Sequence, residues 1–212
     1  FDMDSGEDLF IGGGKKFFDR KKTDEREIFK KKKKKNYVIS HYAEKDLAQI
    51  SPDPQHPFGY LSADNSPLTA ESGRDYLEPA TRLAPPFLAK RSNKGFFLMI
   101  EGSQIDWGGH ANETQYIVNE MLDFDKAVGL ALDFAKADGR SLVIITADHE
   151  TGGFSINPGS VMGSIKGAFT TDQHTGTLIP VFAYGPGAEL FGGVYENTAI
   201  YHKMRRALGF DK

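Results

Sequence analysis

Cysteine is absent from the 212 residues of this sequence. Its absence excludes disulfides and thiolate metal sites, so any bound metal must be held by histidine, aspartate or glutamate. Nitrogen and oxygen ligands without sulfur fit a catalytic zinc or a harder cation better than a structural zinc. The composition therefore leaves room for a catalytic metal site but for no structural zinc site built on cysteine.

Long apolar runs and a strong excess of one charge are also missing. No apolar run approaches the roughly 20 residues that span a bilayer. Residues 1–4 have neither the basic start nor the apolar segment of a signal peptide. The net charge is −3, in a chain with 39% hydrophobic and 26% charged residues. We therefore expect a globular protein with no membrane span and no nucleic-acid partner.

Hydrophobic periodicity and turn residues divide the chain into short strands and helices. We expect strands over residues 9–11, 37–39, 58–61, 96–100, 141–147 and 179–184, and helices over 24–35, 75–91, 113–137 and from 197 or 198 onward. Pro85 and Pro86 are expected to kink or split the second helix. Asn112 is the expected N-cap of the third helix. The lysines at 30–35 are expected to form the solvated end of the first helix rather than a nucleic-acid patch.

Two of the expected strands, residues 96–100 and 141–147, end in clusters of side chains that bind metals. The first cluster contains Glu101, Asp106 and His110, and the second contains Asp148 and His149. The helix over 113–137 joins the two strands, which predicts parallel strands with a right-handed crossover. Ligands of open α/β sheets bind beyond the carboxyl ends of the strands. We therefore expect the two clusters to face a common crevice.

Spacing limits how these side chains can point. Asp106 and His110 are four residues apart, so one helical turn would place them on one side. Asp148 and His149 are adjacent, so either each takes a different ion or the strand bends there. His174, in a stretch rich in glycine, serine and threonine, is a further candidate. Each residue alone also fits a plain role as cap, turn or surface residue, but the six together favour a metal site.

Five motifs lie along the chain in a fixed order. They are LFIGGG at 9–14, EGSQIDWGGHAN at 101–112, TADHETGG at 146–153, HTG at 174–176 and ENTAIYHK at 196–203. Together they resemble the alkaline phosphatase family, over nearly the whole chain. The resemblance implies an α/β fold with a mostly parallel sheet flanked by helices, here incomplete.

The same resemblance implies two Zn²⁺ ions and one Mg²⁺ ion, acting on phosphate monoesters. Asp106, His110 and His174 would hold the zinc that activates water, Asp148 and His149 would hold the zinc that activates a serine nucleophile, and Glu101 would bind magnesium. Trp107 matches a variable position near the phosphate. The resemblance also implies a periplasmic or extracellular location.

The chain departs from the family pattern at the nucleophile. The family serine lies in an Asp-Ser-Ala turn after a core strand, and residues 4–6, Asp-Ser-Gly, match it only superficially. Residues 1–212 are therefore expected to be the C-terminal portion of a single alkaline-phosphatase-like domain, with the nucleophile missing and the isolated chain inactive. A homodimer is possible, although the span from His149 to His174 is too short for the interface insertion of some relatives. The alternatives are an inactive metal-binding fragment, or a sister enzyme acting on phosphodiesters or sulfate esters.

Overall fold

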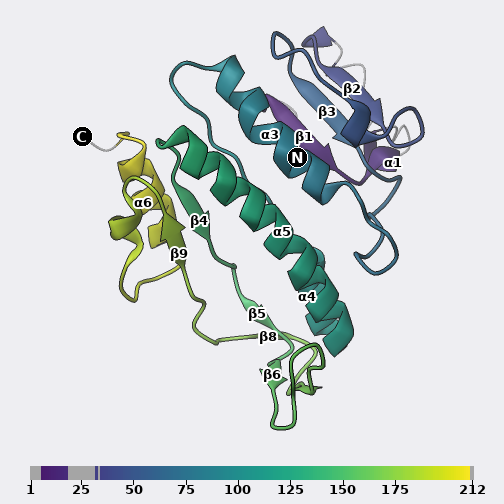
Figure 1. The fold of residues 1–212 in the computed structure, drawn as a ribbon, viewed down its shortest axis with the longest axis vertical. Coiled ribbons are helices and arrows are strands. Elements are labelled where there is room, and N and C mark those ends of the chain that lie inside the picture. The colour runs from purple at the N-terminus through teal and green to yellow at the C-terminus, as the bar shows by residue number, and fades with distance from the viewer. Residues whose placement is uncertain (1–5, 19–31, 33, 211–212) are drawn as a thin grey trace. The chain divides into compact units, whose positions relative to one another are not determined.

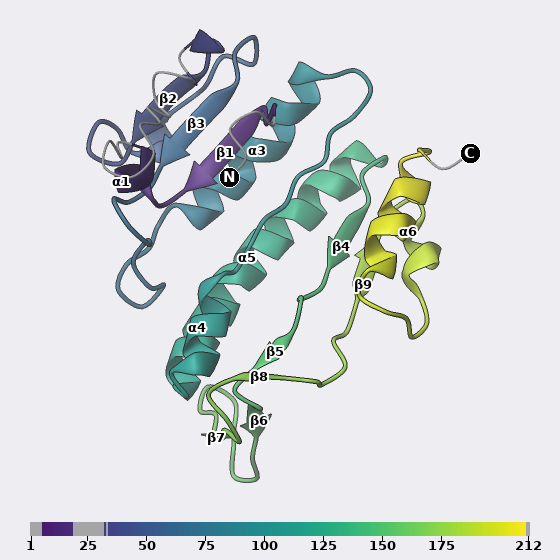
Figure 2. The same cartoon turned by 180° about the vertical axis from the view of Figure 1, so that it is seen from behind.

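The computed structural model describes residues 6–18, 32 and 34–210. The chain divides into two compact units, Phe1–Ile100 and Glu101–Lys212 (Figures 1 and 2). The helix expected over 24–35 lies almost wholly outside the described residues. That both units belong to a single family domain stays a prediction.

A three-stranded parallel sheet forms the centre of the first unit. Its order is β1 (Leu9–Gly12), β3 (Phe58–Leu61) and β2 (Val38–His41). The unit also contains α1 (Lys15–Phe18), η1 (Leu47–Gln49) and α3 (Leu77–Arg91). The expected strands at 9–11, 37–39 and 58–61 are confirmed, and so is the α/β class with a parallel sheet and helices.

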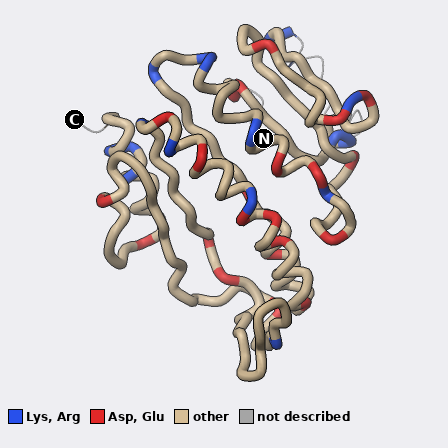
Figure 3. The backbone as a smooth tube through the Cα atoms, viewed as in Figure 1, with Lys and Arg blue, Asp and Glu red and all other residues tan. Residues whose placement is uncertain are grey.

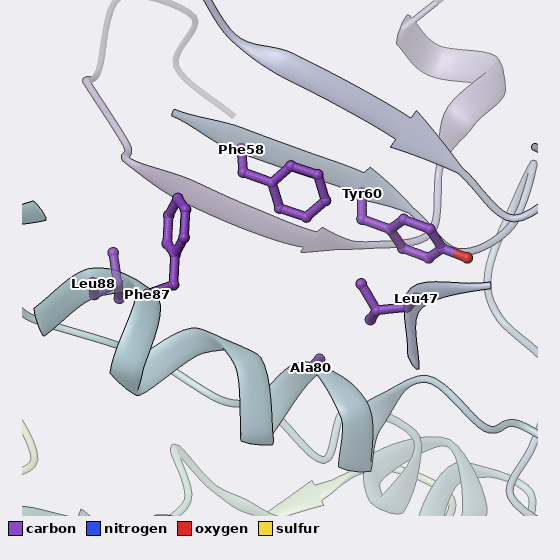
Figure 4. Close-up of a cluster of buried hydrophobic side chains, with 6 residues drawn as sticks. All are labelled: Leu47, Phe58, Tyr60, Ala80, Phe87 and Leu88. Atoms are coloured by element: carbon purple, nitrogen blue, oxygen red, sulfur yellow. The ribbon is translucent and has the colours of Figure 1, made fainter. Parts of the chain in front are cut away.

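The central strand β3 is buried along its whole length because both faces of the sheet are covered. On one face its aromatic residues meet α3 and η1, in a cluster formed by Leu47, Phe58, Tyr60, Ala80, Phe87 and Leu88 (Figure 4). On the other face the cluster is Phe10, Phe18, Tyr37 and Leu61. Gly59 admits the ring of Phe10, since a Cβ there would lie 2.1 Å from the ring. This alternation is what a strand with two covered faces requires.

Helix α3 runs without a break through Pro85 and Pro86, so of the expected kink or split the split is wrong. Each proline removes one backbone hydrogen bond. The helix nevertheless buries Ala84, Pro85, Phe87 and Leu88. Packing of that apolar face against the sheet holds the helix together where its backbone bonding is weakest.

Residues 96–100 do not form the expected strand. Phe96 and Leu98 pack partly against the cluster beneath α3, whereas Phe97 and Met99 are 63% and 77% exposed. The side chains therefore alternate as in a strand, but no sheet among the described residues includes this segment. Apolar alternation is a local property, and a strand also needs a neighbouring strand for its backbone groups.

Lys32 is an exception to the expected solvated lysine run. Its side chain is 1% exposed, and its Nζ donates to Glu7 Oε2 at 3.0 Å and to the Tyr37 hydroxyl at 3.3 Å. Lys34 and Lys35 are exposed, as expected. The buried ammonium has an acidic partner and an aromatic neighbour, which is how a buried lysine is tolerated.

In its described part, the second unit contains three α-helices, one 3-10 helix and pairs of short strands. The elements are α4 (Gln104–His110), α5 (Thr114–Asp138), β4 (Val143–Ile145), β5 (Glu150–Thr151), β6 (Ser155–Ile156), β7 (Gly167–Ala168), β8 (His174–Thr175), β9 (Phe182–Tyr184), η2 (Ala188–Phe191) and α6 (Ala199–Ala207). The pairs β4–β9, β5–β8 and β6–β7 are all antiparallel. The expected parallel strand–helix–strand unit is therefore wrong for the described residues, since β4 pairs with β9 and residues 96–100 form no strand.

The ends of α5 and α6 follow from particular residues. The N-cap of α5 is Glu113 rather than the expected Asn112, which has φ 55° and turns the chain between α4 and α5. Gly139 ends α5 at φ 68°, and its N–H donates to the Ala135 carbonyl at 2.8 Å. The C-cap of α6 is Leu208, and Gly209 follows it in the left-handed conformation at φ 74°. Acidic and basic residues both lie along α5 (Figure 3). In the described part of the chain no helix is long and apolar enough to cross a membrane.

Candidate metal centre

Helix α4 and strand β8 bring three of the predicted metal ligands together, Asp106, His110 and His174, called the Asp–His–His group below. Their ligand atoms all lie within 4.8 Å of one another. Asp106 Oδ1 is 3.4 Å from His110 Nε2 and 3.5 Å from His174 Nε2. The two Nε2 atoms are 3.2 Å apart. One helical turn aligns Asp106 with His110, as expected from their spacing.

The pairing of β5 with β8 positions the third member. Thr151 lies opposite His174 in this antiparallel pair, and the Gly152 N–H donates to the Gln173 carbonyl at 2.9 Å. Helix α4 lies close against β5 because Gly109 has no side chain, and a Cβ there would lie 2.7 Å from the Thr151 carbonyl oxygen. The group thus depends on a glycine contact between two elements separated by the whole of α5.

A backbone carbonyl determines the tautomer of His110. Its Nδ1 is 2.6 Å from the carbonyl oxygen of Asp172. A carbonyl can only accept, so Nδ1 carries the proton and the Nε2 of the neutral ring has a free lone pair. That lone pair faces Asp106 Oδ1 and His174 Nε2. An arrangement in which a second hydrogen bond orients a histidine is typical of metal ligands.

The Asp–His–His group fits a zinc ion. One carboxylate oxygen and two imidazole nitrogens converge, and lone pairs this close are stabilised by a shared proton or by a cation among them. Three nitrogen and oxygen ligands with a fourth position left open are typical of catalytic zinc. The side chains of Asp106, His110 and His174 are 35%, 39% and 49% exposed, so a small ligand can reach them.

Asp148 and His149 adjoin this group. The chain bends at Asp148, between β4 and β5, and Asp148 Oδ2 lies 3.4 Å from His149 Nε2. Both side chains therefore lie on one side, and of the two expected arrangements the structure has the bend. The ring of His149 stacks on that of His174, with centroids 3.5 Å apart and planes at 20°.

Glu101 and Trp107 are not part of the Asp–His–His group. Glu101 is exposed just before α4, and Trp107, on α4, is 43% exposed. Of the six residues predicted to bind metals, three thus form the group, two adjoin it and Glu101 does not join it. Their roles as ligands, and that of Trp107 toward substrate, stay predictions.

Sequence reasoning missed three groups that hold the centre together: the Asp172 carbonyl, Thr151 and Glu150. Thr151 Oγ1 donates to Asp106 Oδ1 at 2.5 Å. Thr151 follows His149 by two residues, and in an extended segment this spacing places both side chains on one face. That spacing in the sequence indicates Thr151 as a neighbour of His149, whereas no sequence pattern indicates a backbone carbonyl such as that of Asp172.

Glu150 ties β5 to β8 and to the turn that follows β5. Its carboxylate accepts from the backbone N–H of Phe154 at 2.9 Å and of Gly153 at 3.1 Å, and from the Thr175 hydroxyl. Burial alone would raise the pKa of Glu150, but the bonds from Thr175, Phe154 and Gly153 together lower it below its ordinary value of 4.5. The ionised carboxylate is therefore the form that the fold favours.

We expect Glu150→Gln to destabilise the chain by about 1–3 kcal/mol, because the bonds to a charged acceptor are replaced by weaker ones. A lowered pKa adds stability that is present above pH 4.5 and is lost as the pH falls through the folded-state value. The difference between wild type and variant in urea unfolding should thus be largest near neutral pH and shrink in acid. Equal stability at neutral pH would contradict this role for Glu150.

The chain is similar to known proteins along nearly all its length. It matches the family described as alkaline phosphatase over residues 3–168 and 165–210. Alkaline phosphatase 3 of Bacillus subtilis is 32% identical, with 58% of this chain and 42% of that protein covered. Alkaline phosphatase of Escherichia coli is 36% identical, with 58% of this chain and 30% of that protein covered. The chain thus spans less than half of these curated relatives.

Solved structures agree with this match. The alkaline phosphatase from the Antarctic bacterium TAB5 is 43% identical with a TM-score of 0.88, and the match covers 99% of this chain and 63% of that one. A variant of the TAB5 enzyme, 44% identical with a TM-score of 0.87, has Mg bound in its M3 site. The match to the family covers far more than half of this sequence, and the chain therefore belongs to the alkaline phosphatase family.

Proposed function

We propose that this chain supplies the zinc-binding part of a centre that hydrolyses phosphate monoesters. The observation that carries the proposal is the Asp–His–His group, whose oxygen and two nitrogens converge within 4.8 Å. Asp148 and His149 adjoin it through the stacked rings of His149 and His174. Family membership favours monoesters over the phosphodiesters and sulfate esters of sister enzymes.

Each predicted ligand would bind one of three metal ions. Asp106, His110 and His174 would hold one zinc ion, Asp148 and His149 a second, and Glu101 a magnesium ion. When bound, these cations would supply the positive charge that offsets the two negative charges of a phosphate monoester. The Asp172 carbonyl keeps the His110 Nε2 lone pair directed toward the group. Trp107, half-exposed on α4, would lie beside the substrate.

Residues 4–6, Asp-Ser-Gly, resemble the turn of the family's serine nucleophile only superficially, and residues 4 and 5 lie outside the described residues. We propose that the chain by itself binds metal without turnover, which is the inactive-fragment alternative. Supporting this, the match covers 63% of the TAB5 chain. A homodimer and a periplasmic or extracellular location stay predictions for the family-length protein.

A chimera tests the proposal. The part of the TAB5 enzyme that this sequence does not match would be joined to the whole chain, in family order, and supplied with zinc and magnesium. We expect the chimera to hydrolyse an aryl phosphate and the chain alone to show no turnover, because only the chimera contains both ligands and nucleophile. Zinc content is measured on both proteins by elemental analysis.

A matched variant makes the result specific. Asp106→Asn in the chimera removes the negative charge of one predicted zinc ligand while keeping the shape of the side chain. It should abolish both zinc retention and hydrolysis. A chimera that folds and retains zinc but leaves the aryl phosphate intact would contradict the proposed function. Turnover by the chain alone would contradict its assignment as an inactive portion.

A further inference from the structure

The hydroxyl of Thr151 lies between two sets of predicted ligands, the Asp–His–His group and the pair formed by Asp148 and His149. Thr151 Oγ1 is 2.5 Å from Asp106 Oδ1 and 3.2 Å from His149 Nδ1. A hydroxyl has one proton, and an ionised carboxylate can only accept. The proton therefore goes to Asp106, and the Thr151 oxygen is left to accept a proton from the His149 ring.

This assignment determines the tautomer of His149. Nδ1 must carry the proton in order to donate to Thr151, so the Nε2 of the neutral ring has a free lone pair. Nε2 approaches Asp148 Oδ2 at 3.4 Å, a long distance for a hydrogen bond and one at which the two atoms could share a cation. His149 thus has the same tautomer as His110, whose Nδ1 faces the carbonyl of Asp172.

Thr151 is also held in place by its surroundings. It pairs with His174 across β5 and β8. Its backbone and side chain pack so closely on Gly109 that a Cβ there would lie 2.8 Å from Thr151 Cβ. The backbone and Cβ of Thr151 are thus held beside α4, the helix that carries Asp106.

We propose that Thr151 is a positioning residue that links the two ligand sets, orienting Asp106 in one and selecting the tautomer of His149 in the other. The role toward a metal rests on the proposed function, whereas the two hydrogen bonds do not. Coupling of this kind is reciprocal, so a cation at either set would favour the geometry that the other needs. Loss of such supporting bonds typically weakens metal binding by about 10–100-fold.

Two variants separate the hydroxyl from the shape of the side chain. Thr151→Val keeps the branched shape that packs on Gly109 and removes the hydroxyl, while Thr151→Ser keeps the hydroxyl and removes the methyl group. Thr69→Val is the matched control, since the Thr69 hydroxyl donates to Ser72 Oγ at 2.8 Å and accepts from the Ser72 N–H at 3.1 Å, in an exposed turn of the first unit. Zinc affinity of the full chain is measured by competition with a chromophoric chelator. We expect about 10–100-fold weaker binding for Thr151→Val and near-wild-type binding for the other two.

The tautomer is measured separately, on the metal-free chain at alkaline pH, by long-range ¹H–¹⁵N correlation of the His149 ring. We expect the proton on Nδ1 in wild type and Thr151→Ser, and a shift toward Nε2 in Thr151→Val. An unchanged tautomer in Thr151→Val overturns the proposal, as does unchanged zinc affinity or equal loss in the valine and serine variants. If the wild-type chain binds no zinc, the proposed function is wrong. The positioning role of Thr151 is then tested by the His149 tautomer measurement alone.

Discussion

Replacing His174 with alanine is expected to remove zinc from the Asp–His–His group and to lower hydrolysis by the chimera by about 10³-fold or more. His174 supplies one of three converging donors, with its Nε2 3.2 Å from that of His110. Its ring also stacks on that of His149, so its loss removes a contact that holds His149, which with Asp148 forms the second set of predicted ligands. Loss of a ligand should weaken zinc binding by more than the roughly 100-fold typical of a lost supporting bond.

Zinc per chain and its affinity are measured by elemental analysis and chelator competition. His56→Ala is the matched control, because His56 is exposed in a loop of the first unit, among residues that contribute nothing to the Asp–His–His group. A chelator should lower the activity of the wild-type chimera to the level of His174→Ala. It should lower the activity of the His174→Ala chimera little further. Zinc retained at wild-type affinity in His174→Ala would show that this histidine is not a ligand.

The parts of this centre that could be predicted from sequence are those determined by local geometry. The Asp106–His110 spacing needs only one helical turn, and α4 supplies it despite two glycines. The position of His174 relative to that turn depends on the pairing of β5 with β8, which no local pattern encodes. Its assignment came from resemblance, and the structure shows the tertiary contact that brings it there.

Three of the wrong predictions have one cause: a pattern in the local sequence does not determine which residues pack against it. Residues 96–100 have the alternation of a strand without a strand beside them among the described residues. Pro85 and Pro86 weaken α3 locally, yet burial of its apolar face keeps it whole. Lys32 belongs to a run that looks solvated, but Glu7 and Tyr37 meet its ammonium group inside the first unit. In each case tertiary packing overrides the local preference.

Gly109→Ala is expected to disturb the centre without touching any ligand. The new Cβ would lie 2.7 Å from the Thr151 carbonyl oxygen and 2.8 Å from Thr151 Cβ, and the backbone oxygen cannot move aside by rotating a bond. Helix α4 must therefore shift away from β5. Overpacking of this kind costs about 1–3 kcal/mol, offset by up to about 1 kcal/mol from the better helix propensity of alanine.

The shift matters because the centre spans the α4–β5 contact. Asp106 and His110 lie on α4, whereas Thr151 and its partner His174 lie on β5 and β8. A displacement approaching 1 Å should lower activity of the chimera by about 10²-fold, with a matching fall in zinc affinity by chelator competition.

Gly129→Ala in α5 is the control for the change from glycine to alanine, since among the described residues no atom beyond the adjacent helix backbone lies within 4 Å of a Cβ there. It should leave zinc binding unchanged and stabilise the chain by up to about 1 kcal/mol in urea unfolding. If Gly109→Ala binds zinc as tightly as Gly129→Ala, the two elements can separate without disturbing the ligands. The close approach at Gly109 would then serve stability alone.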